Sequence, residues 1–301
     1  MKMWTKIAGS ICVLVGLLVG TSVAQAANEK KDFRIVLTPE RNIFEQQRKY
    51  QNLCDYSCKL LPLNFRFEVL KGYKEVLLAL KEGRADGAFM GSFIAAYGID
   101  NYGFIPLVRP VWPTGESHYR SYIFKRSGLP VTRDIATWKG RSFVFVGPHT
   151  SAGYFFPLSL LRSNGVKEPG EFFSNIRFAG SHDAAVWMVA NGIAEIGAAK
   201  NTVFEEIIKR KPELGEKIEI LYTGGNYPDS TLVVRAEIPQ EIRESMRRVF
   251  LRMDSHQEGQ EVLKMFGALK FVKTSPDEYD GVRQVVKESG YEINSIRVLD
   301  N

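Results

Sequence analysis

The sequence predicts a two-lobed α/β protein that binds its ligand in a cleft between the lobes, for three reasons. Short apolar runs alternate with segments of helical periodicity, as in α/β proteins. Several of these runs are apolar on both sides, which indicates a parallel sheet with helices on both faces. Two turn-rich segments, at 112–116 and 223–228, have the character of crossings between lobes. Clefts in such proteins bind ligands where strand ends and helix starts meet.

The first residues have the pattern of a secretory signal peptide. Lys2 and Lys6 precede an uncharged stretch from Ile7 to Val23, and small residues at 24 and 26 flank a cleavage site near Ala26. The alternative is a transmembrane anchor, since the uncharged stretch is close to the length that spans a membrane. The glycines within it and the Ala-Gln-Ala sequence favour cleavage. We therefore predict a periplasmic protein, exported and cleaved near Ala26.

Strands and helices of the mature chain follow in order from the hydrophobic pattern. The expected strands are Arg34–Leu37, Phe65–Val69, Gly87–Met90, Tyr119–Phe124, Ser142–Val146, Ile196–Ala199, Ile218–Leu221 and Thr231–Val234. The expected helices include Phe44–Leu60, Tyr73–Glu82, Phe155–Ser163 and Ala184–Asn191, and Pro239 opens another. Ser275-Pro276-Asp277-Glu278 has the sequence of a capping box with a first-turn proline.

Composition and cysteine content narrow the class of protein. Of 301 residues 45% are hydrophobic and 25% charged, which excludes a disordered or low-complexity chain. The net charge of +6 is small and spread along the chain, so it is weak evidence for nucleic acid, although it suits an anionic ligand. Once Cys12 leaves with the signal peptide, Cys54 and Cys58 remain, one helical turn apart. They are either two core thiols or a disulfide, and no further ligands suggest a metal site.

A loop between a strand and a helix is the strongest candidate for ligand binding. Val146-Gly147-Pro148-His149-Thr150-Ser151-Ala152-Gly153-Tyr154 follows an apolar strand and precedes a helical run. Free first-turn amides and the helix dipole favour an anion there, and Thr150 and Ser151 add hydroxyl donors. The alternative is a plain Ser/Thr N-cap without a ligand.

A second candidate is Gly180-Ser181-His182-Asp183, which precedes an alanine-rich helix. Asp183 is a possible N-cap, and His182 is either a donor to an anion or a buried core histidine. No G-x-S-x-G, P-loop, dinucleotide-binding or H-E-x-x-H motif occurs, so we predict neither an enzyme nor a bound cofactor or metal.

These two segments resemble the periplasmic phosphonate/phosphite-binding receptors of ABC importers. Thr150–Tyr154 followed by Pro157 resembles that family's S-T-S-G-Y…P loop, and 180–199 resembles its G-S-H-D-A-A-V…N-G-x-A-D-A-G-A stretch. Upstream, Lys49-Tyr50, Tyr73, Leu80, Gly83, Asp86 and Gly91 are similar to a further stretch of the family. The resemblance runs in order from about residue 33 to 250.

The resemblance implies a class II-type, two-lobed binding protein with a hinge and a central cleft that closes on a phosphorus oxyanion. It implies that the oxyanion is held by the Thr150–Tyr154 loop: the Thr150 and Ser151 hydroxyls and the amides of Ala152 and Gly153. His182 would donate from the facing edge, and Tyr73 would close over the ligand from the first lobe.

The departures from the family pattern bear on the ligand. Ala152 replaces a serine of the family loop, and Ser92 stands in a motif whose usual aromatic residue is missing, with Tyr97 pointing elsewhere on a helix. Where receptors of aminoalkylphosphonates have a carboxylate for the amine, this chain has Asn201 and Thr202 beside Lys200, and only Asp229 offers a substitute. These departures argue against 2-aminoethylphosphonate and leave phosphite, a small alkylphosphonate, phosphate or another anion open. Ser92, Asn201 and Asp229 complete the candidate site.

These inferences define a domain plan and a function. We expect a signal peptide (1–26), a first lobe (27–118), a second lobe (119–230) and a return to the first lobe with C-terminal helices (231–301), with hinges near 116–120 and 226–231. The expected function is capture of the anion by a monomer and delivery to an inner-membrane ABC permease. The alternative is a sensory protein that signals to a membrane histidine kinase or chemoreceptor. A secreted hydrolase using Ser151 is the third hypothesis.

Overall fold

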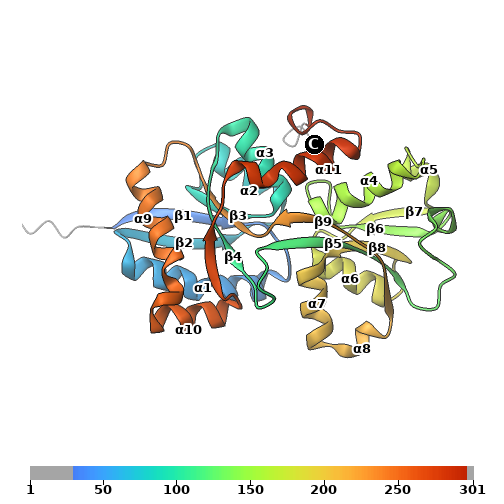
Figure 1. Cartoon of the computed structure of the whole chain (residues 1–301), viewed down its shortest axis with the longest axis horizontal. Helices are drawn as coiled ribbons and strands as arrows, with labels where there is room; N and C mark the ends of the chain where they lie inside the picture. Colours follow the sequence, from blue (N-terminus) through green and yellow to red (C-terminus); the bar gives the residue numbers. More distant parts are fainter. Residues whose placement is uncertain (1–29, 297–301) are drawn as a thin grey trace, which may run out of the picture. The chain divides into compact units, whose positions relative to one another are not determined.

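The computed structural model describes residues 30–296, and residues from Lys31 onward form one compact unit. The predicted signal peptide, its cleavage site and Cys12 lie outside the described residues. Two separate β-sheets organise the unit, one with six strands and one with five (Figure 1). The two-sheet α/β architecture agrees with the predicted fold class.

The first sheet has the strand order β11-β4-β10-β3-β1-β2. Its strands are β1 (Lys31–Leu37), β2 (Leu63–Val69), β3 (Gly87–Met90), β4 (Ile105–Val111), β10 (Thr231–Val234) and β11 (Lys270–Lys273). Helices α1 (Ile43–Leu60), α9 (Gln240–Leu251) and α10 (Gln257–Phe266) cover one face. Helices α2 (Tyr73–Lys81) and α3 (Ser92–Tyr102) cover the other, and α11 (Asp280–Glu288) packs against α3.

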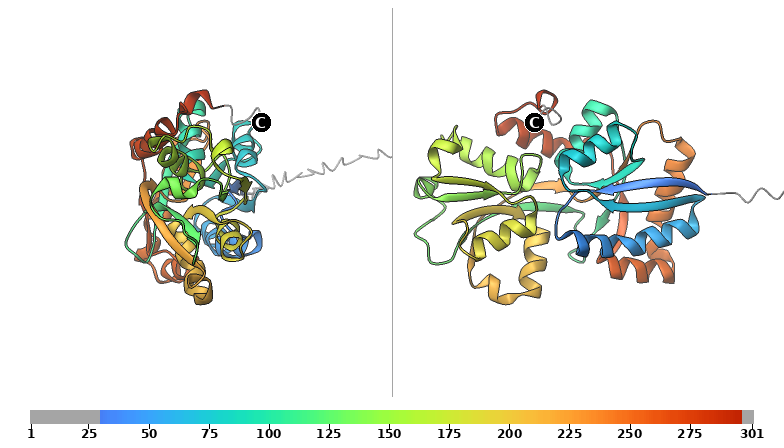
Figure 2. Two further views of the ribbon diagram at one scale, coloured as in Figure 1. Left: turned by 90° about the vertical axis from the view of Figure 1, so that its right-hand side faces the viewer. Right: turned by 180° about the vertical axis from the view of Figure 1, so that it is seen from behind.

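The second sheet has the order β7-β6-β8-β5-β9. Its strands are β5 (His118–Arg126), β6 (Ser142–Phe145), β7 (Asn175–Phe178), β8 (Ile196–Lys200) and β9 (Ile218–Pro228). Helices α4 (Phe156–Ser163) and α5 (Pro169–Phe172) pack on one face, and α6 (His182–Ala190), α7 (Asn201–Arg210) and α8 (Pro212–Gly215) on the other (Figures 1 and 2). Short 3-10 helices are η1 (Ile135–Trp138), η3 (Met253–Ser255), η4 (Pro276–Tyr279) and η5 (Ile293–Ser295), and η2 (Ser151–Phe155) is a π-helix that leads directly into α4.

The predicted parallel pairing holds for only part of each sheet, where β1 pairs with β2 and β3, and β6 pairs with β7 and β8. Strand β10 pairs antiparallel with both β3 and β4, and β5 pairs antiparallel with β8 and β9. Asp229 and Ser230 alone join β9 of the second sheet to β10 of the first, so β10 enters the first sheet directly from the second. Strands β4, β7 and β11 are absent from the sequence prediction.

The prediction of a turn-rich segment at 223–228 is wrong, because these residues form the second half of β9. They pair with the start of β5 through one register shift, between Tyr227 and Gly224. Gly224 is required there, since a Cβ atom on it would lie 2.2 Å from the Phe156 ring. Gly224 and Gly225 are typical of a turn, but here they allow a bulged strand to pass close to an aromatic side chain.

The structure also settles some local features. The capping box at Ser275 and Glu278 forms as expected. Cys54 and Cys58 are not joined by a disulfide, and both sulfur atoms face the backbone of Phe65. No helix among residues 30–296 is long and apolar enough to cross a membrane.

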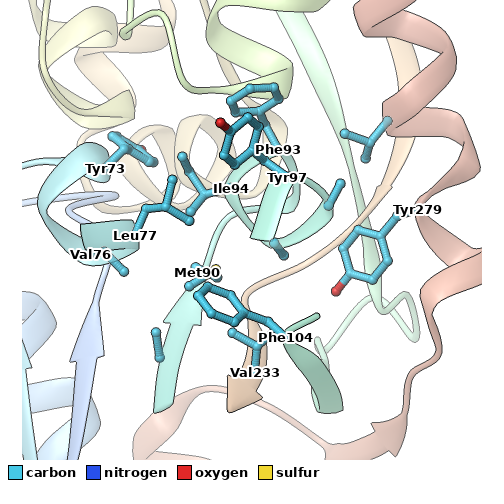
Figure 3. Close-up of a cluster of buried hydrophobic side chains, with 14 of the residues drawn as sticks. Tyr73, Val76, Leu77, Met90, Phe93, Ile94, Tyr97, Phe104, Val233 and Tyr279 are labelled. Atoms are coloured by element: carbon cyan, nitrogen blue, oxygen red, sulfur yellow. The ribbon is translucent and has the colours of Figure 1, made fainter. Parts of the chain in front are cut away.

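An apolar cluster connects elements of the two sheets. It joins α2, α3 and α11 to η2, and the rings of Phe93 and Phe155 lie 4.4 Å apart within it. Helix α11 contacts both α3 and α4 (Figure 1). Figure 3 shows Tyr73, Phe93 and Tyr97 together at one end of the cluster. The helix starts described next lie beside this packed region.

Candidate functional site

Four helices of the two halves begin near one another, and the first residue of each carries a hydrogen-bond donor. These first residues are Tyr73 of α2, Ser92 of α3, Ser151 of η2 and His182 of α6. None of the four preceding N-cap residues makes a side-chain cap bond. No N-cap side chain therefore occupies the first-turn amides of α2, α3 and η2, which favour negative charge with the helix dipole. In α6 the amide of His182 donates to the Glu40 carbonyl and that of Ala184 to Asp183.

Three buried hydroxyl groups link two of these helix starts. The oxygen of Ser92 lies 2.8 Å from that of Ser151 and 2.5 Å from that of Tyr119 on β5. Burial raises the pKa of Tyr119 to about 12, so its hydroxyl stays protonated. Three hydroxyls carry three protons but share only two hydrogen bonds, which leaves one proton to donate outward.

His182 is held as a neutral donor. The Lys200 backbone N–H donates to its Nδ1 over 3.1 Å, so the ring proton lies on Nε2. Burial, with the charge of Lys200, lowers the pKa of His182 to about 3. An Nε2–H donor is therefore present throughout the neutral pH range.

Tyr73 presents a buried hydroxyl without a hydrogen-bond partner. The residue is 7% exposed, and its oxygen has no hydrogen-bond partner among residues 30–296. Burial raises its pKa well above the usual value, so it remains a donor. A buried hydroxyl left unsatisfied is costly, which is the expected state of a group that awaits a ligand.

The loop before η2 supplies amides more than hydroxyls. The Thr150 hydroxyl donates to the carbonyl of Gly147 over 2.9 Å, so its proton is already used within the loop. A Cβ atom on Gly153 would lie 2.4 Å from Cβ of Val146, so only glycine lets the helix start this close to the end of β6. Ala152 is fully buried, and its carbonyl accepts from Ser121.

A buried ion cluster lies behind the hydroxyls. The Lys200 ammonium, on a side chain 2% exposed, is 3.0 Å from both carboxylate oxygens of Glu40 and also pairs with Asp229. Although burial opposes the charged form, the two carboxylates raise the pKa of Lys200. Asp229 is among the residues predicted from the sequence, but Glu40 is not. Its position just after the end of β1 could have indicated that it belongs to the site.

Three residues depart from their expected roles. The Tyr154 ring packs against Phe145 and Phe178, so this residue offers its backbone rather than its hydroxyl to the loop. The Asn201 side chain accepts from the backbone N–H of Arg120 over 2.7 Å.

The third is Asp183, and its prediction as an N-cap is wrong. Ser181 holds that position, because α6 begins one residue before Asp183. The Asp183 carboxylate instead accepts the backbone N–H groups of Ala184 and Asn42, each over 2.8 Å. Within residues 30–296, no group of three or more His, Cys, Asp or Glu side chains is arranged to hold a metal ion.

Comparisons with known proteins indicate the family of this chain. A family model described as the phosphonate periplasmic substrate-binding protein of ABC transporters matches residues 35–279. The probable ABC transporter phosphite binding protein of Prochlorococcus marinus is 26% identical over 164 residues, which span 53% of this chain and about half (54%) of that protein. The phosphate-import protein of Mycolicibacterium smegmatis is 22% identical, with 95% of each chain covered.

A solved structure shows the same fold. The Prochlorococcus marinus protein in complex with methylphosphonate superposes with a TM-score of 0.77 at 18% identity. The superposition covers 87% of this chain and 99% of that one.

Proposed function

The chain belongs to the family of periplasmic substrate-binding proteins of phosphonate ABC transporters, and we propose that its four convergent helix starts bind a small phosphorus oxyanion. Proteins of this family are binding components of transporters and not enzymes, and they work in the periplasm. The family match favours transport over a sensory role. The observation that carries the proposal is the set of buried donors at the first residues of α2, α3, η2 and α6.

The donors suit an oxyanion because each is neutral and fixed. Tyr73, Ser151 and His182 present O–H or N–H groups, and the amides of the Thr150–Tyr154 loop add further donors. Hydrogen bonds to a charged group contribute about 1.5–3 kcal/mol each, so four or five exceed the roughly 8 kcal/mol of a micromolar complex. The surplus can offset the cost of closing and ordering the cleft.

The proposal also concerns which phosphorus oxyanion is bound. The relatives named above are described as binding or importing phosphite, phosphate or methylphosphonate. We propose that this chain takes one of these three kinds of ligand, since the donors at the helix starts are neutral and suit a small tetrahedral anion.

Capture would proceed by lobe closure. We assign residues 27–118 and 231–301 to one lobe and 119–230 to the other, with hinges near 116–120 and 226–231, because the chain changes sheets between β4 and β5 and again between β9 and β10. A monomer that closes on its ligand would then dock on an inner-membrane permease. Cleavage near Ala26 would release the protein into the periplasm.

A thermal-shift screen of the purified protein tests the proposal. The panel is phosphite, phosphate, methylphosphonate and sulfate, with a ligand at a hundred times its dissociation constant expected to stabilise the fold by about 2.7 kcal/mol. A rise in melting temperature with a phosphorus anion, absent in Ser151→Ala, supports it. If no phosphorus oxyanion shifts the melting temperature, the proposed ligand class is wrong.

A further inference from the structure

The buried ion cluster has a feature that the oxyanion donors do not explain. Lys200 on β8 reaches between Glu40, from the loop before α1, and Asp229, which lies between β9 and β10. Its ammonium also lies 4.5 Å from the centre of the Tyr119 ring. Two carboxylates and an aromatic face are the groups that recognise an organic ammonium ion.

Both carboxylates are held in place by groups other than Lys200. The Ser230 hydroxyl donates to Glu40 over 3.2 Å, and the Trp112 indole N–H donates to the second oxygen of Asp229 over 2.6 Å. Asp229 is fully buried, and Glu40 is 9% exposed. The ammonium cage of Glu40, Asp229 and the Tyr119 ring is therefore preorganised, and the Lys200 ammonium is its occupant.

The ammonium cage adjoins the oxyanion donors. Tyr119 has its ring against the ammonium and its hydroxyl 2.5 Å from Ser92. The Lys200 backbone N–H donates to His182. A Cβ atom placed on Gly91, directly before Ser92, would lie 3.8 Å from the Glu40 carboxylate. A substituent on an anion bound at Ser92 and Ser151 is therefore within reach of the ammonium cage.

We propose that Lys200 is a specificity-determining residue: its ammonium fills an ammonium-binding subsite and so excludes phosphonates that carry their own ammonium group. This inference rests on the proposed function, because it concerns the substituent of the same ligand. An aminoethyl group has one heavy atom fewer than the part of the lysine side chain beyond Cβ. Removal of Lys200 would therefore leave both the space and the charge that such a ligand needs.

A purely structural ion cluster makes a different prediction. If Lys200 only stabilises the fold, its removal lowers stability and affects all ligands alike. The quantity that separates the two explanations is therefore the ratio of the dissociation constants of two ligands of equal size. 2-Aminoethylphosphonate and n-propylphosphonate form such a pair, because they differ by an ammonium in place of a methyl group.

The experiment is titration calorimetry of both ligands, with methylphosphonate as the reference anion. It compares the wild type, Lys200→Ala, and Lys200→Ala combined with Asp229→Asn. Lys125→Ala is the matched control, because Lys125 is also buried and paired, with Glu219 at 3.1 Å, and lies on the same sheet. Lys200→Gln replaces Lys200→Ala if the alanine variant does not fold.

We expect the wild type and Lys125→Ala to show no preference for the ammonium ligand. Lys200→Ala should bind 2-aminoethylphosphonate at least about tenfold more tightly than n-propylphosphonate, and Asp229→Asn should reduce that ratio. The proposal is overturned if the wild type already prefers the ammonium ligand tenfold. It is equally overturned if a folded Lys200 variant binds methylphosphonate but gains no such preference.

A second measurement separates this inference from the proposed function. Ethylammonium chloride should raise the melting temperature of Lys200→Ala more than that of the wild type, compared with an equal concentration of sodium chloride. This rescue needs no phosphonate, so it would persist even if no protein bound any phosphorus oxyanion and the proposed function failed. Equal shifts in the two proteins would contradict the existence of the ammonium cage.

Discussion

Replacing Ser151 by alanine tests the role of the hydroxyl at the start of η2. The side chain is 1% exposed, and its oxygen lies 2.8 Å from that of Ser92. Ser92 keeps its hydrogen bond to Tyr119 in the variant, so no buried group is left without a partner. The free energy of unfolding should therefore fall by only about 1 kcal/mol.

The effect on ligand affinity should be much larger. A hydroxyl that donates to an anion contributes about 1.5–3 kcal/mol, which corresponds to a dissociation constant about 10- to 150-fold higher without it. Titration calorimetry with methylphosphonate measures this ratio directly. Ser159→Ala is the matched control, because Ser159 is a buried serine of the following helix whose hydroxyl donates to the Phe156 carbonyl.

A comparison of the two variants shows whether the Ser151 hydroxyl contacts the ligand. We expect Ser159→Ala to bind like the wild type, within about threefold, and Ser151→Ala to bind at least tenfold more weakly. If Ser151→Ala remains folded and binds within threefold of the wild type, the Ser151 hydroxyl does not contact the ligand. The assignment of the oxyanion to these helix starts would then be wrong.

Three further predictions concern stability. Gly153→Ala should lower the free energy of unfolding by about 1–3 kcal/mol or more in calorimetry, because its Cβ would lie 2.4 Å from Cβ of Val146; an unchanged melting temperature would contradict this packing. Below pH 6.5 the unfolded His182 gains a proton that the folded form, with its pKa lowered to about 3, does not, so stability falls with decreasing pH. His182→Gln should remove about 1.4 kcal/mol per pH unit of that slope between pH 6 and 4, and parallel unfolding curves for the two proteins would refute it. Glu40→Ala should cost about 3 kcal/mol, since Lys200 keeps only one carboxylate; a loss below 1 kcal/mol in urea unfolding would show that the buried pair contributes little.

The parts of the site that lie close together in the sequence could be predicted from it. The Thr150–Tyr154 loop has a strand before it, a helix after it and hydroxyls between, so its anion-binding character follows from one contiguous stretch. In the structure, η2 begins within this loop, at Ser151. The same holds for His182, which the helical pattern puts beside the start of α6.

Contacts between distant residues could not be predicted. Glu40 and Lys200 are 160 positions apart, and no local pattern indicates that one neutralises the other. From the sequence, only Asp229 could be offered as a carboxylate for a ligand's amine. In the structure, Glu40 and Asp229 form a pair of carboxylates, and Lys200 already lies between them. Strand direction is similarly non-local, since the antiparallel entry of β10 depends on where the chain returns from the second sheet.

The most direct test of the central claim is a crystal structure of the protein with methylphosphonate. The account predicts phosphonate oxygens within about 3.2 Å of the Ser151 hydroxyl, the Tyr73 hydroxyl and Nε2 of His182. Lys200 should remain between Glu40 and Asp229 in that complex. A phosphonate bound elsewhere, with the Tyr73 hydroxyl still lacking a partner, would contradict the account.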